Sequence, residues 1–154
     1  MTVEIGKPAP AFTMPTDGNG KVALSALKGR NVILYFYPKD DTSGCTAEAC
    51  GFRDAMPNFS KIDATIVGVS KDTVASHDRF KAKYGLPFIL ASDKDTGVAE
   101  KYGVWVEKSM YGRKYMGLER STVLIDAKGV VRGIWRKVKV AGHVEEVLKA
   151  VEAL

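Results

Sequence analysis

The chain has only two cysteines, and they lie five positions apart in the segment PKDDTSGCTAEAC, residues 38–50. An apolar run, NVILYFY (31–37), precedes this segment, and apolar residues at helical spacing follow it, so Cys45 falls in the first turn of an expected helix. Unpaired backbone N–H groups and the helix dipole favour an anion at that place. A thiol there ionises more readily than a free thiol, and the thiolate is the nucleophile. The segment therefore predicts redox chemistry at cysteine.

Whether Cys45 and Cys50 can form a disulfide depends on the helix between them. Five residues of ideal α-helix rise about 7.5 Å and leave the two Cα atoms about 8.7 Å apart. A disulfide needs Cα atoms within about 6.8 Å. Either the two thiols never join, or joining them unwinds at least one turn, which the neighbouring Gly44 and Gly51 would ease.

The thiolate also needs a cation, because three nearby acids would oppose ionisation if they pointed inward: Asp40, Asp41 and Glu48. The candidates for the cation are Arg53, further along the same helix, and Arg120, at the start of the run STVLID. Both arginines stay charged at any working pH, so neither is excluded by chemistry alone.

Thr42 and Pro38 each have a structural interpretation beside a functional one. Thr42 or Ser43 stands where the N-cap of the expected helix belongs, so Thr42 could serve the helix alone. Pro38 ends the apolar strand, because proline cannot donate a hydrogen bond to a sheet ladder.

Length and composition predict a single domain over residues 1–154. The chain is 45% hydrophobic and 27% charged, as in ordinary globular proteins, and no stretch approaches the roughly 20 apolar residues that span a bilayer. The N-terminus lacks a basic stretch followed by an apolar core, so we expect a cytoplasmic protein without a secretory leader. Two cysteines are too few for a structural zinc site, and His77 and His143 show no ligand spacing, so we expect no metal.

The net charge of +5 is concentrated late in the chain. Residues 128–139 carry five cations and no acid: Lys128, Arg132, Arg136, Lys137 and Lys139. A basic face of this kind either binds nucleic acid or forms a solvated hairpin edge, where cations discourage association between strands. Because no nucleic-acid-binding motif accompanies the charge, we expect the hairpin edge.

The apolar patterns predict elements in the order β-α-β-α-β-α-β-β-α. After a tight turn in DGNGKVAL (17–24), with Gly18 and Gly20 available for positive φ, strands are expected at 31–37, 64–70, 88–93, 121–126 and 130–135. Helices are expected from Cys45 to about Phe59, with a kink or division at Pro57, and at 73–85, 98–103 and 142–154. This order predicts an α/β protein with a central mixed sheet flanked by helices. It resembles the thioredoxin fold with an N-terminal extension and an inserted helix, although the cysteine spacing is C-x-x-x-x-C rather than C-x-x-C.

A more specific resemblance rests on the cysteine segment and the region around Arg120. PKDDTSGC fits the pattern P-x-x-x-T-x-x-C of the peroxiredoxins. The second cysteine and EKSMYGRKYMGLERSTVLID (107–126) are similar to the Q-type branch, the bacterioferritin comigratory proteins, and the likeness extends from IGKPAPAF to the last helix. It implies that Cys45 is the peroxidatic nucleophile and Cys50 the resolving thiol. It also implies that Thr42 and Arg120 activate the site and that Pro38 shields it, while Pro57 departs from the family pattern.

The resemblance implies a thiol peroxidase for hydrogen peroxide and organic hydroperoxides, in antioxidant defence. Its Cys45 sulfenic acid would condense with Cys50, and thioredoxin or a similar dithiol would restore both thiols. No cofactor, metal, nucleic-acid or membrane partner is implied, and a monomer suffices because both thiols belong to one chain. Two other functions remain open from the residues alone: a general thiol-disulfide oxidoreductase or redox sensor, and a basic binding or chaperone-like protein with incidental cysteines.

Overall fold

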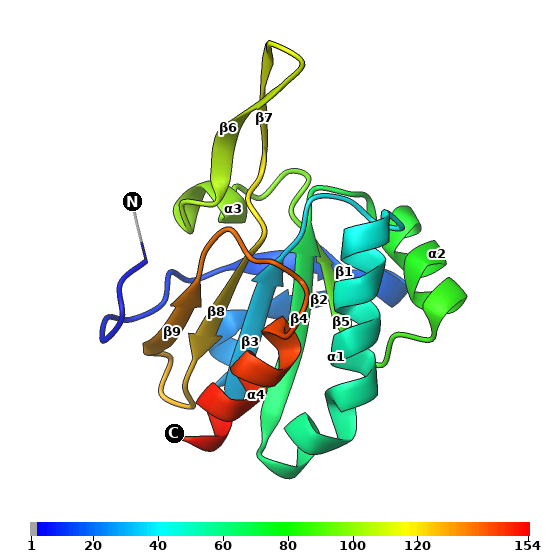
Figure 1. The fold of residues 1–154 in the computed structure, drawn as a ribbon. Helices are drawn as coiled ribbons and strands as arrows, with labels where there is room; N and C mark the ends of the chain where they lie inside the picture. Colours follow the sequence, from blue (N-terminus) through cyan, green and yellow to red (C-terminus); the bar gives the residue numbers. More distant parts are fainter. Residues whose placement is uncertain (1–2) are drawn as a thin grey trace.

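Three parallel strands form the middle of the sheet: β3 (Asn31–Phe36), β4 (Ala64–Ser70) and β5 (Ile89–Ser92). Their residues are largely β-branched, aromatic or small, and almost all are buried, as expected of strands covered on both faces. The computed structural model, which describes residues 3–154, places these strands beside four others in one mixed sheet (Figure 1). The predicted strands at 31–37, 64–70 and 88–93 are confirmed.

Antiparallel hairpins complete the sheet on either side, in the order β2-β1-β5-β4-β3-β8-β9. One hairpin is β1 (Thr13–Thr16) with β2 (Gly20–Ala23), and the other is β8 (Ser121–Ile125) with β9 (Val131–Trp135). Because β9 is the outermost strand, most of the basic run 128–139 lies on or beside a sheet edge, where cations hinder pairing with another chain. The predicted hairpin edge is confirmed.

Four helices pack against the sheet: α1 (Ser43–Lys61), α2 (Val74–Tyr84), α3 (Val98–Lys101) and α4 (His143–Glu152). Alternate residues of β3 enter two separate apolar clusters, as the period of two in a strand requires. Ile33 and Tyr35 face the cluster formed with α1, α2 and α4, whereas Val32 and Leu34 face the cluster formed with α3 and the N-terminal segments. Helices therefore cover both faces, and the predicted thioredoxin-like α/β fold is confirmed.

Two local predictions were wrong in part. Pro57 does not divide its helix, because α1 continues to Lys61. Phe52 and Phe59, on either side of the proline, are both fully buried, so packing outweighs the loss of one hydrogen bond. In the N-terminal turn Gly18 has the expected positive φ of 69°. Gly20 has a negative φ instead. A glycine is needed there because a Cβ would lie 2.7 Å from the Thr16 hydroxyl oxygen.

The sequence patterns missed a second, two-stranded sheet. β6 (Trp105–Met110) and β7 (Arg113–Leu118) form a hairpin that projects from the body of the molecule (Figure 1). Tyr111 and Gly112 at its tip both have positive φ, as a two-residue turn of this kind requires. The alternation of apolar and polar residues that identifies a strand depends on one buried face, and most residues of this hairpin are exposed on both faces.

None of the helices within residues 3–154 combines the length and apolar character needed to cross a membrane.

Candidate active site

Cys45 lies in the first turn of α1, just after the loop that follows β3. Its side chain is 1% exposed and belongs to the apolar cluster that contains Tyr35 and Phe52. The first hydrogen bond of the helix runs from the N–H of Thr46 to the carbonyl oxygen of Thr42, at 2.8 Å. The preceding N–H groups, including that of Cys45 itself, therefore have no helical acceptor and present their positive ends near the thiol. This is the helix-start position predicted from the sequence.

Arg120 directly contacts the thiol: its Nη2 lies 3.2 Å from Sγ of Cys45. The contact follows from the sheet, because Ser121, the first residue of β8, pairs with Phe36, the last residue of β3. Burial alone lowers the pKa of Arg120, but the charges of Glu48 and Cys45 outweigh burial and raise it. The guanidinium therefore remains a cation beside the sulfur of Cys45.

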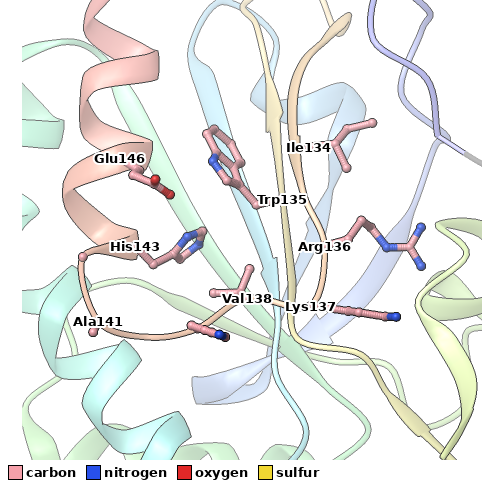
Figure 2. Close-up of a pocket in the computed structure, with 10 residues that line it drawn as sticks. Ile134, Trp135, Arg136, Lys137, Val138, Ala141, His143 and Glu146 are labelled. Carbon is pink, nitrogen blue, oxygen red and sulfur yellow. The ribbon is translucent and has the colours of Figure 1, made fainter.

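The approach of Arg120 depends on a glycine and on a second backbone contact. A Cβ on Gly44 would lie 3.1 Å from Nη2 of Arg120, so any larger residue there would displace the guanidinium. On its other side, the carbonyl oxygen of Arg120 accepts a hydrogen bond of 2.9 Å from the N–H of Val138. Val138 belongs to the segment between β9 and α4, which borders a cavity of about 490 Å³ beside His143 (Figure 2). This segment thus fixes the backbone of Arg120.

Glu48, one helical turn after Cys45, holds the other side of the guanidinium. Its Oε1 accepts a hydrogen bond of 2.6 Å from Nη1 of Arg120, and its side chain is fully buried. Its Oε2 has no partner among the described residues. Burial raises the pKa of Glu48 to about 7 and outweighs Arg120, which lowers it. Glu48 therefore orients Arg120 while carrying less than a full negative charge near neutral pH.

Thr42 precedes α1, but its side chain makes no capping hydrogen bond. Its hydroxyl instead donates to the carbonyl oxygen of Lys39 at 3.0 Å. Since that bond uses the only hydroxyl proton, the oxygen of Thr42 remains available to accept a hydrogen bond from a ligand. Thr42 is therefore the N-cap residue by position, as predicted, but not through its side chain. Pro38 lies exposed in the same loop, one residue after Tyr37.

Cys50 lies on the same helix as Cys45, and both cysteines are free thiols. Cys50 is only partly buried. Because α1 is continuous from Ser43 to Lys61, the geometry of an ideal helix holds the two Cα atoms about 8.7 Å apart. The reduced site therefore keeps the thiols apart, and a disulfide between them requires α1 to open.

Of the two predicted cations, only Arg120 reaches the reactive thiol. Arg53 donates instead to the carbonyl oxygen of Tyr84 at 2.8 Å and to Asp54 at 3.0 Å. Arg53 lies eight residues after Cys45, a rise of about 12 Å along the helix, and its contact with Tyr84 joins α1 to the end of α2.

Sequence analysis missed how two residues would act. From its charge alone Glu48 only opposes the thiolate, although its i, i+3 spacing from Cys45 predicts that both lie on one face of the helix. No sequence pattern indicates a role for His77, yet its Nδ1 lies 2.7 Å from Oδ2 of Asp40, in the loop before α1. Within residues 3–154, Asp40, Asp72 and His77 form the only group with metal-ligand atoms within 4.8 Å of one another.

Comparison with known proteins gives a consistent result. The sequence profile of the AhpC/TSA family matches residues 5–134. The chain is 57% identical to a putative peroxiredoxin Bcp of Coxiella burnetii, over 96% of this chain and 98% of the relative. It is 49% identical to peroxiredoxin Bcp of Bacillus subtilis, over 99% of this chain and 97% of the relative.

Solved structures of similar proteins have the same fold. A structure of the bacterioferritin comigratory protein of Xanthomonas campestris, concerned with its alkyl peroxide reduction activity, is 44% identical with a TM-score of 0.90. The matched region covers 98% of this chain and 96% of the Xanthomonas campestris chain. A variant of the PrxQ protein of Xylella fastidiosa is 39% identical with a TM-score of 0.94, over 99% of this chain and 98% of its own.

The contact between Arg120 and the thiol predicts a graded loss of reactivity. Arg120→Met should slow the reaction of Cys45 with peroxide by about 100-fold, because a preorganised cationic donor is lost. Arg120→Lys should recover part of the rate, since it restores the charge but not the two-nitrogen geometry that bridges Sγ and Glu48. Stopped-flow fluorescence of the reduced variants measures both rates. Equal rates in Arg120→Met and the unmodified protein would rule out this role.

The buried Glu48 predicts a pH-dependent stability. The folded state raises the pKa of Glu48 from 4.5 to about 7, so the contribution of this group is fully present below pH 4.5 and is lost as the pH rises through about 7. The loss should be on the order of 3 kcal/mol in the free energy of unfolding. Glu48→Gln should remove it, because glutamine does not titrate.

Urea unfolding at about pH 5 and about pH 8 tests this, with Cys45→Ser in both proteins so that the thiol does not titrate. The stability of the Glu48→Gln variant relative to its parent should increase at the higher pH. A pH-independent difference would mean that Glu48 is ionised throughout this range.

Proposed function

Because the chain belongs to the AhpC/TSA family, and within it to the Bcp-type peroxiredoxins, which are thiol peroxidases, we propose that Cys45 reduces hydrogen peroxide and organic hydroperoxides and that an intrachain disulfide with Cys50 completes the cycle. The observation that carries this proposal is the 3.2 Å contact between Nη2 of Arg120 and Sγ of Cys45 at the start of α1. Reduction of alkyl peroxide by the Xanthomonas campestris relative supports the inclusion of organic hydroperoxides. The peroxidase assignment replaces the two other functions left open by the residues.

In the first step the Cys45 thiolate attacks one oxygen of the peroxide. A sulfur–oxygen bond forms, the oxygen–oxygen bond breaks, and the departing oxygen leaves as water or an alcohol after taking a proton. The guanidinium of Arg120 stabilises the charge that moves from sulfur to this oxygen. The free lone pair of the Thr42 hydroxyl accepts a hydrogen bond from the peroxide O–H, while exposed Pro38 limits the access of water. Sulfur is oxidised to a sulfenic acid.

In the second step Cys50 attacks the sulfenic sulfur of Cys45. A disulfide forms and the hydroxyl leaves as water, so the two thiols together supply the two electrons that the peroxide consumed. A dithiol reductant, thioredoxin or a similar protein, then restores both thiols by exchange. The resolving thiol belongs to the same chain, so a monomer suffices for the whole cycle.

The two cysteines should have separable roles. Cys45→Ser should abolish peroxide consumption, because it removes the nucleophile at the helix start. Cys50→Ser should still consume one equivalent of peroxide and accumulate a sulfenic acid, which dimedone labelling and mass spectrometry detect. If Cys50→Ser lost the first turnover while Cys45→Ser kept it, the two roles would be reversed.

Formation of the disulfide should open the start of α1. The two Cα atoms must move from about 8.7 Å to within about 6.8 Å, which the intact helix does not allow. Backbone amides of residues 44–51 should therefore exchange with solvent faster in the oxidised protein, and Phe52 and half-buried Met56 should lose packing. Strand β3, buried at the centre of the sheet, should stay protected.

Hydrogen exchange followed by mass spectrometry on both redox states measures this opening. Equal protection at residues 44–51, with the Cys45–Cys50 disulfide confirmed by mass, would contradict the requirement that the helix opens.

A further inference from the structure

Asp40 lies in the middle of the loop between β3 and α1, and its carboxylate is bound on every side. It accepts hydrogen bonds from the hydroxyl of Tyr37 at 2.5 Å, from the hydroxyl of Ser76 at 2.8 Å and from Nδ1 of His77 at 2.7 Å. Its backbone N–H donates to Oδ2 of Asp72 at 2.8 Å. The Asp40 side chain is 4% exposed, so these partners replace water almost completely.

His77 connects Asp40 to the sheet. Its ring is fully buried on α2, with Nδ1 facing Asp40 and Nε2 lying 3.0 Å from the carbonyl oxygen of Ala91 on β5. A carbonyl oxygen only accepts hydrogen bonds, so Nε2 carries a proton. A proton also lies between Nδ1 and the Asp40 carboxylate, because two bare acceptors at 2.7 Å would repel each other. The histidine thus bonds through both nitrogens, one to the loop and one to the rigid sheet.

We propose that His77 is a positioning residue for the peroxidase reaction: acting through Asp40, it fixes the loop from Pro38 to Thr42 in the conformation that presents the Thr42 hydroxyl to the peroxide. This inference rests on the proposed function, because it assigns a support to the loop that the proposal places against the substrate.

The geometry of the loop explains why such a support is needed. The Thr42 hydroxyl is oriented by a hydrogen bond to the carbonyl oxygen of Lys39, which belongs to the same loop. Its direction therefore follows any movement of the loop backbone. Asp41, between Lys39 and Thr42, has a positive φ of 58°. This conformation is strained for a residue other than glycine, so surrounding contacts have to hold it.

The loop is also bound to α2 at a second point, but that contact is exposed. Asp41 accepts hydrogen bonds from Nζ of Lys83 at 2.8 Å and from the hydroxyl of Tyr84 at 2.6 Å. Water competes with an exposed ion pair, which contributes little to rigidity. The buried contact between Asp40 and His77 is therefore the stronger of the two attachments.

A metal ion is a poorer explanation of the same cluster. Asp72, the third member, already accepts hydrogen bonds on Oδ2 from the Asp40 N–H and from the Ser70 hydroxyl at 2.6 Å. Both nitrogens of His77 are also engaged. A cation would have to break several of these bonds, so the cluster fits a structural hydrogen-bond network.

Two amide substitutions of His77 separate its two hydrogen bonds. Asparagine places its amide nitrogen where Nδ1 lies, so His77→Asn keeps a donor for Asp40 and loses the bond to Ala91. Glutamine places its amide nitrogen where Nε2 lies, so His77→Gln keeps the bond to Ala91 and loses the donor for Asp40. Both are made with Cys50→Ser, so that a single turnover of Cys45 is followed without a reductant.

Two rate constants are measured for each variant: consumption of hydrogen peroxide, and alkylation of Cys45 by iodoacetamide. Alkylation requires the thiolate but not a positioned peroxide. We expect His77→Gln to slow peroxide consumption by about 10- to 100-fold, the range that a small misplacement of a binding group produces. Its alkylation rate should stay unchanged, and His77→Asn should keep most of the peroxide rate.

The control variant is Tyr102→Phe, which removes a buried hydrogen bond of 2.6 Å to the carbonyl oxygen of Pro10, far from the loop in the sequence. It should reduce stability without a selective loss of peroxide reactivity. Tyr37→Phe removes another donor from the Asp40 carboxylate and should reproduce the selective loss to a smaller degree, which keeps the proposal testable if the His77 variants do not fold.

Three results would overturn the proposal: equal peroxide rates in the Asn and Gln variants, an unchanged rate in the Gln variant, or a parallel fall of peroxide consumption and alkylation. A Cys50→Ser parent that consumes no peroxide would instead contradict the proposed function itself. The two failures are therefore distinguishable.

Discussion

The site depends on one interaction, the contact between the guanidinium of Arg120 and the sulfur of Cys45 at the start of a helix. The two residues are 75 positions apart in the sequence, so only the sheet brings them together. Strand β3 ends at Phe36, and a short loop leads from it to the start of α1. The antiparallel strand β8 begins beside that end of β3, where Ser121 pairs with Phe36. Apolar clusters cover both faces of the central strands, and the register between β3 and β8 sets the distance between thiol and cation.

The same helix has two opposing requirements. An intact first turn supplies the dipole and the free N–H groups behind Cys45, whereas a disulfide with Cys50 requires that turn to open. Only the first turn of α1 has to open, and the later turns can stay packed in the core. Phe59, fully buried beyond Pro57, holds the last turns of α1 in the core, so that the helix survives even a proline at position 57. The first turn carries Cys45, whose sulfur contacts Arg120, and Arg120 is in turn bound by Glu48.

Much of the fold follows from local sequence, and much of the site does not. The central strands, the capped helix α2 and the helix-start position of Cys45 were predictable because apolar period, Gly85 and proline placement are local signals. The hairpin β6–β7 was not, since it buries no face. The choice between Arg53 and Arg120 as partner of the thiol also needed tertiary structure, because both are cations at plausible positions and only strand pairing distinguishes them. Gly44 and Gly51 were expected to ease unwinding, but the structure gives each a packing reason, against Arg120 and Val144.

The acids around the thiol show why its chemistry survives in an acidic segment. The sequence places three carboxylates within five residues of Cys45, and each would raise the cost of a thiolate if it were free. Each is bound to a specific partner: Asp40 to His77, Asp41 to Lys83 and Glu48 to Arg120. Asp40 and Asp41 bind α2 from the loop before the helix, through a buried and an exposed contact, and Glu48 orients the guanidinium of Arg120. The acids that the sequence alone predicts to be unfavourable are thus bound to partners, and one of them binds the guanidinium that contacts the Cys45 sulfur.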